Sequence, residues 1–177
     1  MRKSQQRLVR LIFSAMMAAL CMVLDRFASF KVINLKIGLA FVPVVLVAVL
    51  CGPLHAALTW GIADLIGALC FPFGPYHPGF TAVAIVGGLL YGLFLHCEKL
   101  TFWRVLTPAL LNALLGLFLN TLWISQLYTS NTYWGFFVGR LATEYSILFP
   151  LNLILIPVMH RLGLLLLRRM EAGGGRA

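Results

Sequence analysis

Three groups of polar side chains interrupt apolar runs of this sequence, and they are the residues that could do chemistry. Polar groups in hydrocarbon are unfavourable unless they face a cavity or a partner. Each group is therefore a candidate ligand contact or a structural pair. The groups are Asp64, the series Asn112, Gly116, Asn120 and Trp123, and the pair Arg140 and Glu144.

Asp64 lies six residues before Phe71, where the apolar run over residues 55–71 ends. At 1.5 Å per residue, its carboxylate would lie about 9 Å inside that end of a helix. An acid there could accept hydrogen bonds from an amino-substituted heterocycle. A structural Asp64, protonated or paired with a neighbour, is the alternative.

The second group follows helical spacing. Asn112, Gly116, Asn120 and Trp123 stand at i, i+4, i+8 and i+11, which predicts one shared helix face. Asn112 and Gly116 favour contact between helices. For Asn120 and Trp123, helix packing and ligand binding stay equally open, since the amide can donate and accept hydrogen bonds and the indole offers a flat surface.

Arg140 and Glu144 are one helical turn apart. The planar guanidinium of Arg140 suits bidentate capture of a carboxylate. In the alternative, Glu144 neutralises Arg140 and the pair is structural.

The elements that must position these residues are membrane helices. Hydrophobic residues make up 61% of the 177 and charged residues 11%, and the mean hydropathy is +0.94. Soluble domains carry roughly 25% charged residues. We therefore predict an all-α integral membrane protein with one domain, residues 1–177, and flexible cytoplasmic tails over 1–7 and 169–177. The six predicted helices are 8–25, 37–51, 55–71, 80–96, 104–127 and 138–167.

Two of the six predicted helices differ from a regular membrane-spanning helix. The run 37–51 is short for a crossing. Pro150 and Pro157 predict a kink in the last helix.

The distribution of Lys and Arg predicts the orientation, because cytoplasmic segments carry the excess of positive charge. Both ends of the chain are basic. With an even number of crossings the two ends lie on the same side of the membrane, and the connections on that side are basic as well. We therefore predict cytoplasmic N- and C-termini, with residues 25–36, 71–79 and 128–134 outside. The outer group of basic residues is Arg26, Lys31 and Lys36.

Several activities are excluded by missing patterns. No Gly is followed by Lys, so the sequence has no phosphate loop for ATP, and it contains neither H-E-x-x-H nor G-x-S-x-G. The basic residues form no stripe with interleaved aromatics, which argues against nucleic acid despite the net charge of +9. We expect no enzymatic activity, no metal and no cofactor.

Small residues mark places where helices can approach closely. Ala15 and Ala19 form one small-xxx-small face, and Gly88 and Gly92 form another. The intervening run Phe71-Pro-Phe-Gly-Pro-Tyr-His-Pro-Gly79 predicts a stiff, aromatic-rich outer loop.

These residues together resemble the substrate-binding S components of the energy-coupling factor (ECF) vitamin transporters, most of all the folate-specific branch. His77 stands where that pattern has an aromatic such as Phe. The resemblance rests on Gly61-Ile-Ala-Asp64, Phe71-Pro-Phe-Gly-Pro-Tyr-His-Pro-Gly-Phe-Thr81, Gly88-Leu-Leu-Tyr-Gly92, Asn120-Thr-Leu-Trp123 and Arg140.

The resemblance implies a multi-pass protein of the prokaryotic plasma membrane that binds folate from outside. It releases the vitamin inward after docking, through Ala15 and Ala19, on a transmembrane coupling protein driven by two ATPases, which alone use ATP. The pterin would lie among the side chains of Asp64, Tyr76, Phe80, Asn120 and Trp123, and the glutamate tail near Arg140, Lys31 and Lys36.

Three alternatives remain beside this interpretation. They are an S component for another flat vitamin (riboflavin, thiamine or biotin), a self-sufficient secondary carrier, and a small membrane scaffold or enzyme. A carrier usually shows internal repeats, and the two halves of this sequence show none.

Overall fold

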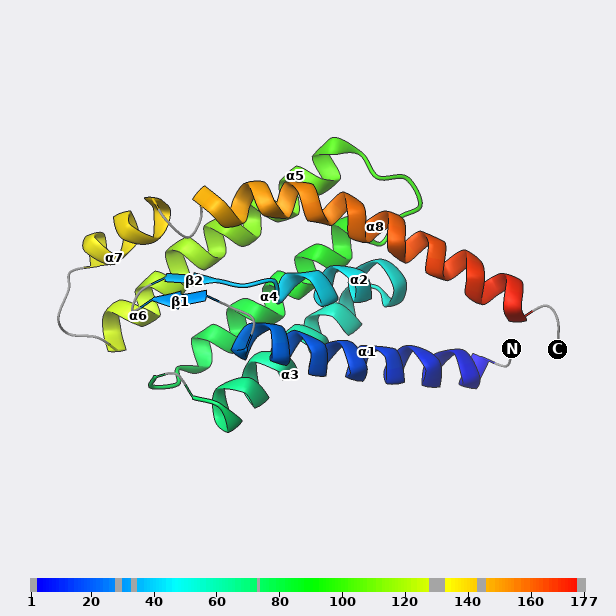
Figure 1. Ribbon diagram of the computed structural model, residues 1–177, viewed down its shortest axis with the longest axis horizontal. Helices are drawn as coiled ribbons and strands as arrows, with labels where there is room; N and C mark the ends of the chain where they lie inside the picture. Colours follow the sequence, from blue (N-terminus) through cyan, green and yellow to red (C-terminus); the bar gives the residue numbers. More distant parts are fainter. Residues whose placement is uncertain are drawn as a thin grey trace.

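The computed structural model describes residues 3–27, 30–32, 35–72, 74–127, 133–142 and 146–174. Helices dominate, and one short antiparallel ribbon joins the first two (Figure 1). In chain order the elements are α1 (Lys3–Arg26), β1 (Phe30–Val32), β2 (Leu35–Ile37), α2 (Phe41–Cys51), α3 (Pro53–Cys70), α4 (Pro78–Leu95), α5 (Phe102–Leu115), the π-helix η1 (Gly116–Asn120), α6 (Thr121–Leu127), α7 (Tyr133–Arg140) and α8 (Ser146–Gly174).

Five of the described segments are long and apolar enough to cross a membrane: Ser4–Arg26, Pro53–Cys70, Pro78–Leu95, Phe102–Leu127 and Ser146–Arg169. The sixth predicted span is represented by α2, which has only 11 residues. That corresponds to about 16 Å of helix against a hydrocarbon core of about 30 Å. The structure thus supports five full spans and one short apolar helix.

The predicted helix over 138–167 is wrong in its first part. Its N-terminal residues belong to α7, which ends at Arg140, and α8 begins only at Ser146. The Ser146 hydroxyl donates to the Leu141 carbonyl at 3.0 Å near this break. Pro150 and Pro157 both lie inside α8.

Three other helix boundaries differ from the predictions by more than two residues. The run 37–51 was expected to be helical from its first residue, but Ile37 pairs with Phe30 in the ribbon. Strands of three residues are too short to show a period of two. At the two ends, α1 starts at Lys3 and α8 continues to Gly174, so helix takes in most of the predicted tails 1–7 and 169–177.

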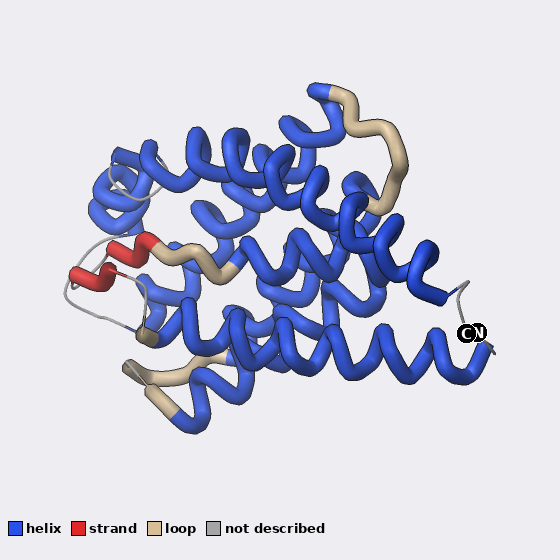
Figure 2. Tube along the Cα trace, turned by 45° about the vertical axis from the view of Figure 1, so that its right-hand side comes forward, coloured by secondary structure: helices blue, strands red, loops and turns tan. Residues whose placement is uncertain are grey.

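Different helices and loops lie at the two ends of the bundle. The start of α1 and the end of α8 lie together at one end, whereas the ribbon, the α3–α4 loop, α6 and α7 gather at the other (Figure 1). Figure 2 shows the red ribbon at that second end, beyond the start of α2.

The core forms around α2, which is apolar along its whole length and is therefore buried on all sides. Val44, Val45, Val47 and Ala48 are fully buried, and α1, α3, α4 and α8 pack around them.

Close contact between α3 and α4 depends on glycine. A Cβ at Gly88 would meet backbone atoms of Ala56 and Ala57, and one at Gly92 would overlap Pro53. The predicted close helix approach at Gly88 and Gly92 is confirmed.

Candidate ligand-binding site

The candidate site is organised by the first turn of α4. Pro78 occupies the N1 position, where its fixed φ suits a helix and its missing N–H is not needed. The preceding residue, His77, is extended and caps the helix: its Nδ1 accepts a hydrogen bond from the Gly79 N–H at 3.0 Å. This geometry directs the residues of the first turn toward α3 on one side and α6 on the other.

On the α3 side, three side chains form a hydrogen-bonded chain. The Thr81 hydroxyl donates to Asp64 Oδ2 at 2.7 Å, and the oxygens of Tyr76 and Thr81 are 2.9 Å apart. Because a hydroxyl has one proton, Tyr76 must be the donor to Thr81. Within the described chain, Asp64 Oδ1 accepts no hydrogen bond. Asp64 is thus oriented by Thr81 with one oxygen left for a ligand.

On the α6 side, the rings of His77 and Trp123 stack, with centroids 4.6 Å apart and planes 21° apart. Phe80 lies edge-on to His77 at 6.3 Å. Gly79 makes the arrangement possible, because a Cβ there would overlap the Trp123 indole. One face of Trp123 is therefore covered by His77, which limits the predicted ligand stacking to the rest of its surface.

Two polar atoms at this point are buried without a hydrogen-bond partner among the described residues. They are Trp123 Nε1 and Asn120 Oδ1. Buried polar atoms in folded proteins nearly always have a partner, so such an exception calls for a functional explanation. One donor and one acceptor, three residues apart in the chain, form half of a site for a polar ring edge.

The predicted single face over residues 112–123 is altered by η1. This π-helical turn spans Gly116–Asn120 and has more residues per turn than an α-helix, so it shifts Asn120 relative to Asn112 around the helix axis. The Asn112 amide bonds the carbonyls of Gly87 and Pro108 at 3.4 and 3.0 Å, which supports its packing role. Asn112 therefore packs against the middle of α4, while Trp123 contacts its first turn at Gly79.

Arg140 ends α7 and is only 5% exposed. Its Nη1 donates to the Thr121 hydroxyl at 3.2 Å, and Thr121 is fully buried next to Asn120. The structure therefore brings Arg140 to the Asn120–Trp123 segment. Glu144, its alternative partner, lies outside the described residues.

Lys31 and Lys36 are directly opposite one another in the ribbon register. Their side chains are outside the described part of the chain. The ribbon itself lies at the same end of the bundle as α6 and α7 (Figure 1).

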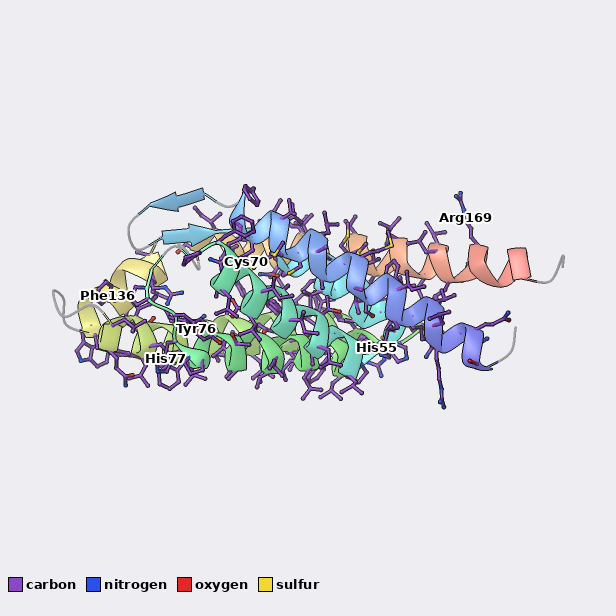
Figure 3. All side chains as sticks on the ribbon, turned by 90° about the horizontal axis from the view of Figure 1, so that it is seen from below. His55, Cys70, Tyr76, His77, Phe136 and Arg169 are labelled. Atoms are coloured by element: carbon purple, nitrogen blue, oxygen red, sulfur yellow. The ribbon has the colours of Figure 1, made fainter. Side chains whose placement is uncertain are left out.

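The side chains labelled in Figure 3 mark the site end. Tyr76, His77 and Phe136 lie toward one end of the bundle, and His55 and Arg169 toward the other.

Sequence reasoning missed three contributors to this site. Thr81 orients Asp64, Thr121 contacts Arg140, and His77 both caps α4 and stacks on Trp123. Thr81 and His77 belong to the loop motif that signalled the site, but their partners are distant in sequence. No local pattern marks Thr121.

The predicted docking face is separate from this site. Ala15 and Ala19 are exposed on α1, while Ala18 between them is buried against the core. No described part of the chain covers the two alanines.

Comparison with known proteins matches residues 9–160 to the family described as "ECF transporter, substrate-specific component". A protein named Folate transporter FolT from Clostridium novyi (strain NT) is 37% identical over 147 residues, covering 82% of this chain and 84% of the relative. Another of that name, from Leuconostoc mesenteroides, is 32% identical over 150 residues, covering 83% and 78%.

A solved structure has the same fold. It is described as a crystal structure of FolT bound with folic acid and superposes with a TM-score of 0.76 and 31% identity, covering 86% of this chain and 91% of that one. The chain belongs to the substrate-specific components of ECF transporters.

Proposed function

We propose that this chain is the folate-binding S component of an ATP-driven ECF importer in a prokaryotic plasma membrane. The related proteins are named folate transporters, and the structure it resembles holds folic acid. The single observation that carries the proposal is the pair of buried atoms Trp123 Nε1 and Asn120 Oδ1, which have no hydrogen-bond partner among the described residues. Thr81, in the first turn of α4, orients Asp64 on the other side of that turn.

The edge of a pterin complements these atoms. Its amino group and ring N–H are donors for Asp64 Oδ1 and Asn120 Oδ1, and its ring nitrogens or carbonyl accept from Trp123 Nε1. The first turn of α4 joins the two sides, since Thr81 bonds Asp64 and Gly79 lies against Trp123. Tyr76, just before that turn, and Phe80, within it, offer aromatic surface to the flat ring.

The glutamate tail of folate carries two carboxylates that need cationic partners. Arg140 is proposed to bind one of them, since a buried guanidinium favours bidentate contact. Lys31 and Lys36, on the ribbon at the same end, are proposed as further cations for the tail.

We infer six crossings, with α2 and the preceding residues 38–40 making the second one. Both termini are then cytoplasmic, and the site opens outside. The excess of Lys and Arg where α1 starts and where α8 ends supports this orientation.

Uptake is proposed to require partners. With no nucleotide-binding loop in its sequence, the chain would depend on two ATPases acting through a transmembrane coupling protein. The exposed Ala15 and Ala19 give a coupling helix room to approach α1 closely.

Isothermal titration of the purified chain with folic acid, riboflavin, biotin and thiamine tests the ligand. We expect one folate per chain at nanomolar affinity, about −12 kcal/mol, and no comparable binding of the others. Tight binding of another vitamin with none of folate would retain the transporter class and overturn the substrate.

Vesicle reconstitution tests the mode of action. The chain alone is expected to bind folate without accumulating it. Gradient-driven uptake by the chain alone would favour a secondary carrier.

A further inference from the structure

A cavity lies toward the opposite end of the bundle from the proposed folate site. It has a volume of about 460 Å³ and is formed by the connection between α4 and α5, the start of α5, and α8. In Figure 1 this connection loops out above α8. The lining residues that matter here are Glu98, Thr101, Val105, Leu153, Arg161 and Leu164.

The cavity has charged residues near the α4–α5 connection and mostly apolar residues further along α5 and α8. One buried polar side chain, His160, is also in its wall and is hydrogen-bonded to the Cys97 carbonyl at 2.8 Å. Glu98 and Thr101 precede α5, and Val105 lies one turn further into that helix. On α8, which runs in the opposite sense, Leu153 lies two turns deeper than Arg161. Because both helices cross the membrane, the polar groups are at the water interface and the apolar ones extend into the hydrocarbon. A phospholipid has the same gradient.

The charged residues at the mouth of the cavity, Glu98 and Arg161, do not form an ion pair with each other. Glu98 and Arg161 are both exposed, and within the described part of the chain no ion pair involves either. The Thr101 hydroxyl makes no capping hydrogen bond to α5. One carboxylate, one guanidinium and one hydroxyl are therefore available to a ligand.

This combination selects among head groups. Arg161 and Thr101 can donate to a phosphate, and Glu98 can accept from an ammonium. A purely anionic head group would meet repulsion from Glu98. A choline head group has no N–H to donate to Glu98.

Exposed aromatic residues also place this mouth at the membrane interface. Phe102 is 65% and Trp103 67% exposed, directly beside Thr101. Aromatic side chains of this kind concentrate at the level of lipid head groups.

We propose that this cavity binds a phospholipid with a primary-amine head group, its phosphate on Arg161 and Thr101 and its ammonium on Glu98. In the orientation proposed above, the lipid comes from the inner leaflet. The lipid site does not depend on which vitamin the chain carries, since none of its residues belongs to the folate site.

Native mass spectrometry of the full chain, released from detergent with added phosphatidylethanolamine, phosphatidylglycerol or phosphatidylcholine, tests the site. The wild-type chain should retain phosphatidylethanolamine most. Glu98→Gln should reduce that adduct about fivefold to tenfold, as expected for one charge-assisted hydrogen bond, and leave the phosphatidylcholine adduct unchanged. Arg161→Gln should reduce both adducts, because both lipids carry the phosphate.

A matched control lies further along α8. Arg168→Gln makes the same charge change as Arg161→Gln at an exposed residue that does not line the cavity, and it should leave the adducts at the wild-type level. Equal retention of all three lipids by the wild-type chain would overturn the proposal. So would a phosphatidylethanolamine adduct that survives Glu98→Gln, or a wild-type chain that retains phosphatidylglycerol most.

Discussion

The imidazole of His77 stacks on the indole of Trp123 across the first turn of α4, with ring centroids 4.6 Å apart. Gly79 lies against the same indole, and its missing side chain leaves the space that the ring occupies. The position of Trp123, and with it the buried Nε1, is therefore set by residues of the α3–α4 loop and of α4. Three consecutive features of the loop motif, a capping His, a Pro and a Gly, act together on one residue of α6.

Gly79→Ala should move Trp123 and weaken folate binding. Overpacking typically costs about 1 to 3 kcal/mol, so titration should show roughly 10- to 100-fold lower affinity. Gly135→Ala is the matched control, because a Cβ there meets nothing within 4 Å. Unchanged affinity in Gly79→Ala would mean that the position of Trp123 is unimportant for the ligand.

Thr81→Val should release Asp64 from its 2.7 Å hydrogen bond while keeping the shape of the side chain. Folate affinity should fall about tenfold, since hydrogen bonds to charged groups contribute about 1.5 to 3 kcal/mol. Thr81→Ser retains the hydroxyl and should bind nearly as the wild-type chain does. If both variants bind equally well, Asp64 is not oriented for the ligand by Thr81.

Trp123→Phe separates a ligand contact from a structural role. The indole Nε1 is buried with no hydrogen-bond partner among the described residues, so its removal breaks no hydrogen bond in the ligand-free chain. Any fall in melting temperature should then reflect only the packing lost against His77 and Gly79. Folate affinity should nevertheless fall by about 1 kcal/mol, roughly fivefold. Trp134→Phe, at a side chain that is 67% exposed, is the control. Loss of stability with full affinity would assign Trp123 to packing.

Arg140→Lys tests contact with the glutamate tail. A lysine keeps the charge but loses the planar fork, so folate should bind about tenfold more weakly. Pteroate, which lacks the glutamate, should bind both forms equally. In the structural alternative, Arg140→Ala and Glu144→Ala each damage the protein and the double variant restores it. That restoration would remove Arg140 from the site.

Ala15→Leu or Ala19→Leu should prevent close approach of a coupling helix to α1. Co-purification with the coupling protein and folate uptake should be lost, while titration of the isolated chain shows unchanged folate affinity, because the binding site is on other helices. Val158→Leu enlarges an exposed residue of α8 and should leave assembly intact. Loss of folate binding with assembly preserved would reverse the assignment of these alanines.

Composition and local spacing were sufficient to predict membrane helices and the residues that break their apolar pattern. The predicted close approach at Gly88 and Gly92 is also confirmed, since glycines at helical spacing on an apolar helix leave room for a neighbour. These properties depend on residues within a few positions of one another, so periodicity reveals them.

The relationships that make up the site needed the tertiary structure, because they join residues far apart in the chain. Thr81 reaches Asp64 over 17 positions, and Arg140 reaches Thr121 over 19. The π-helical turn η1 also changes which residues share a face, and a regular 3.6-residue period cannot anticipate it. The division of the run 138–167 between α7 and α8 also escaped prediction, because the spacing of Arg140 and Glu144 is compatible with one continuous helix.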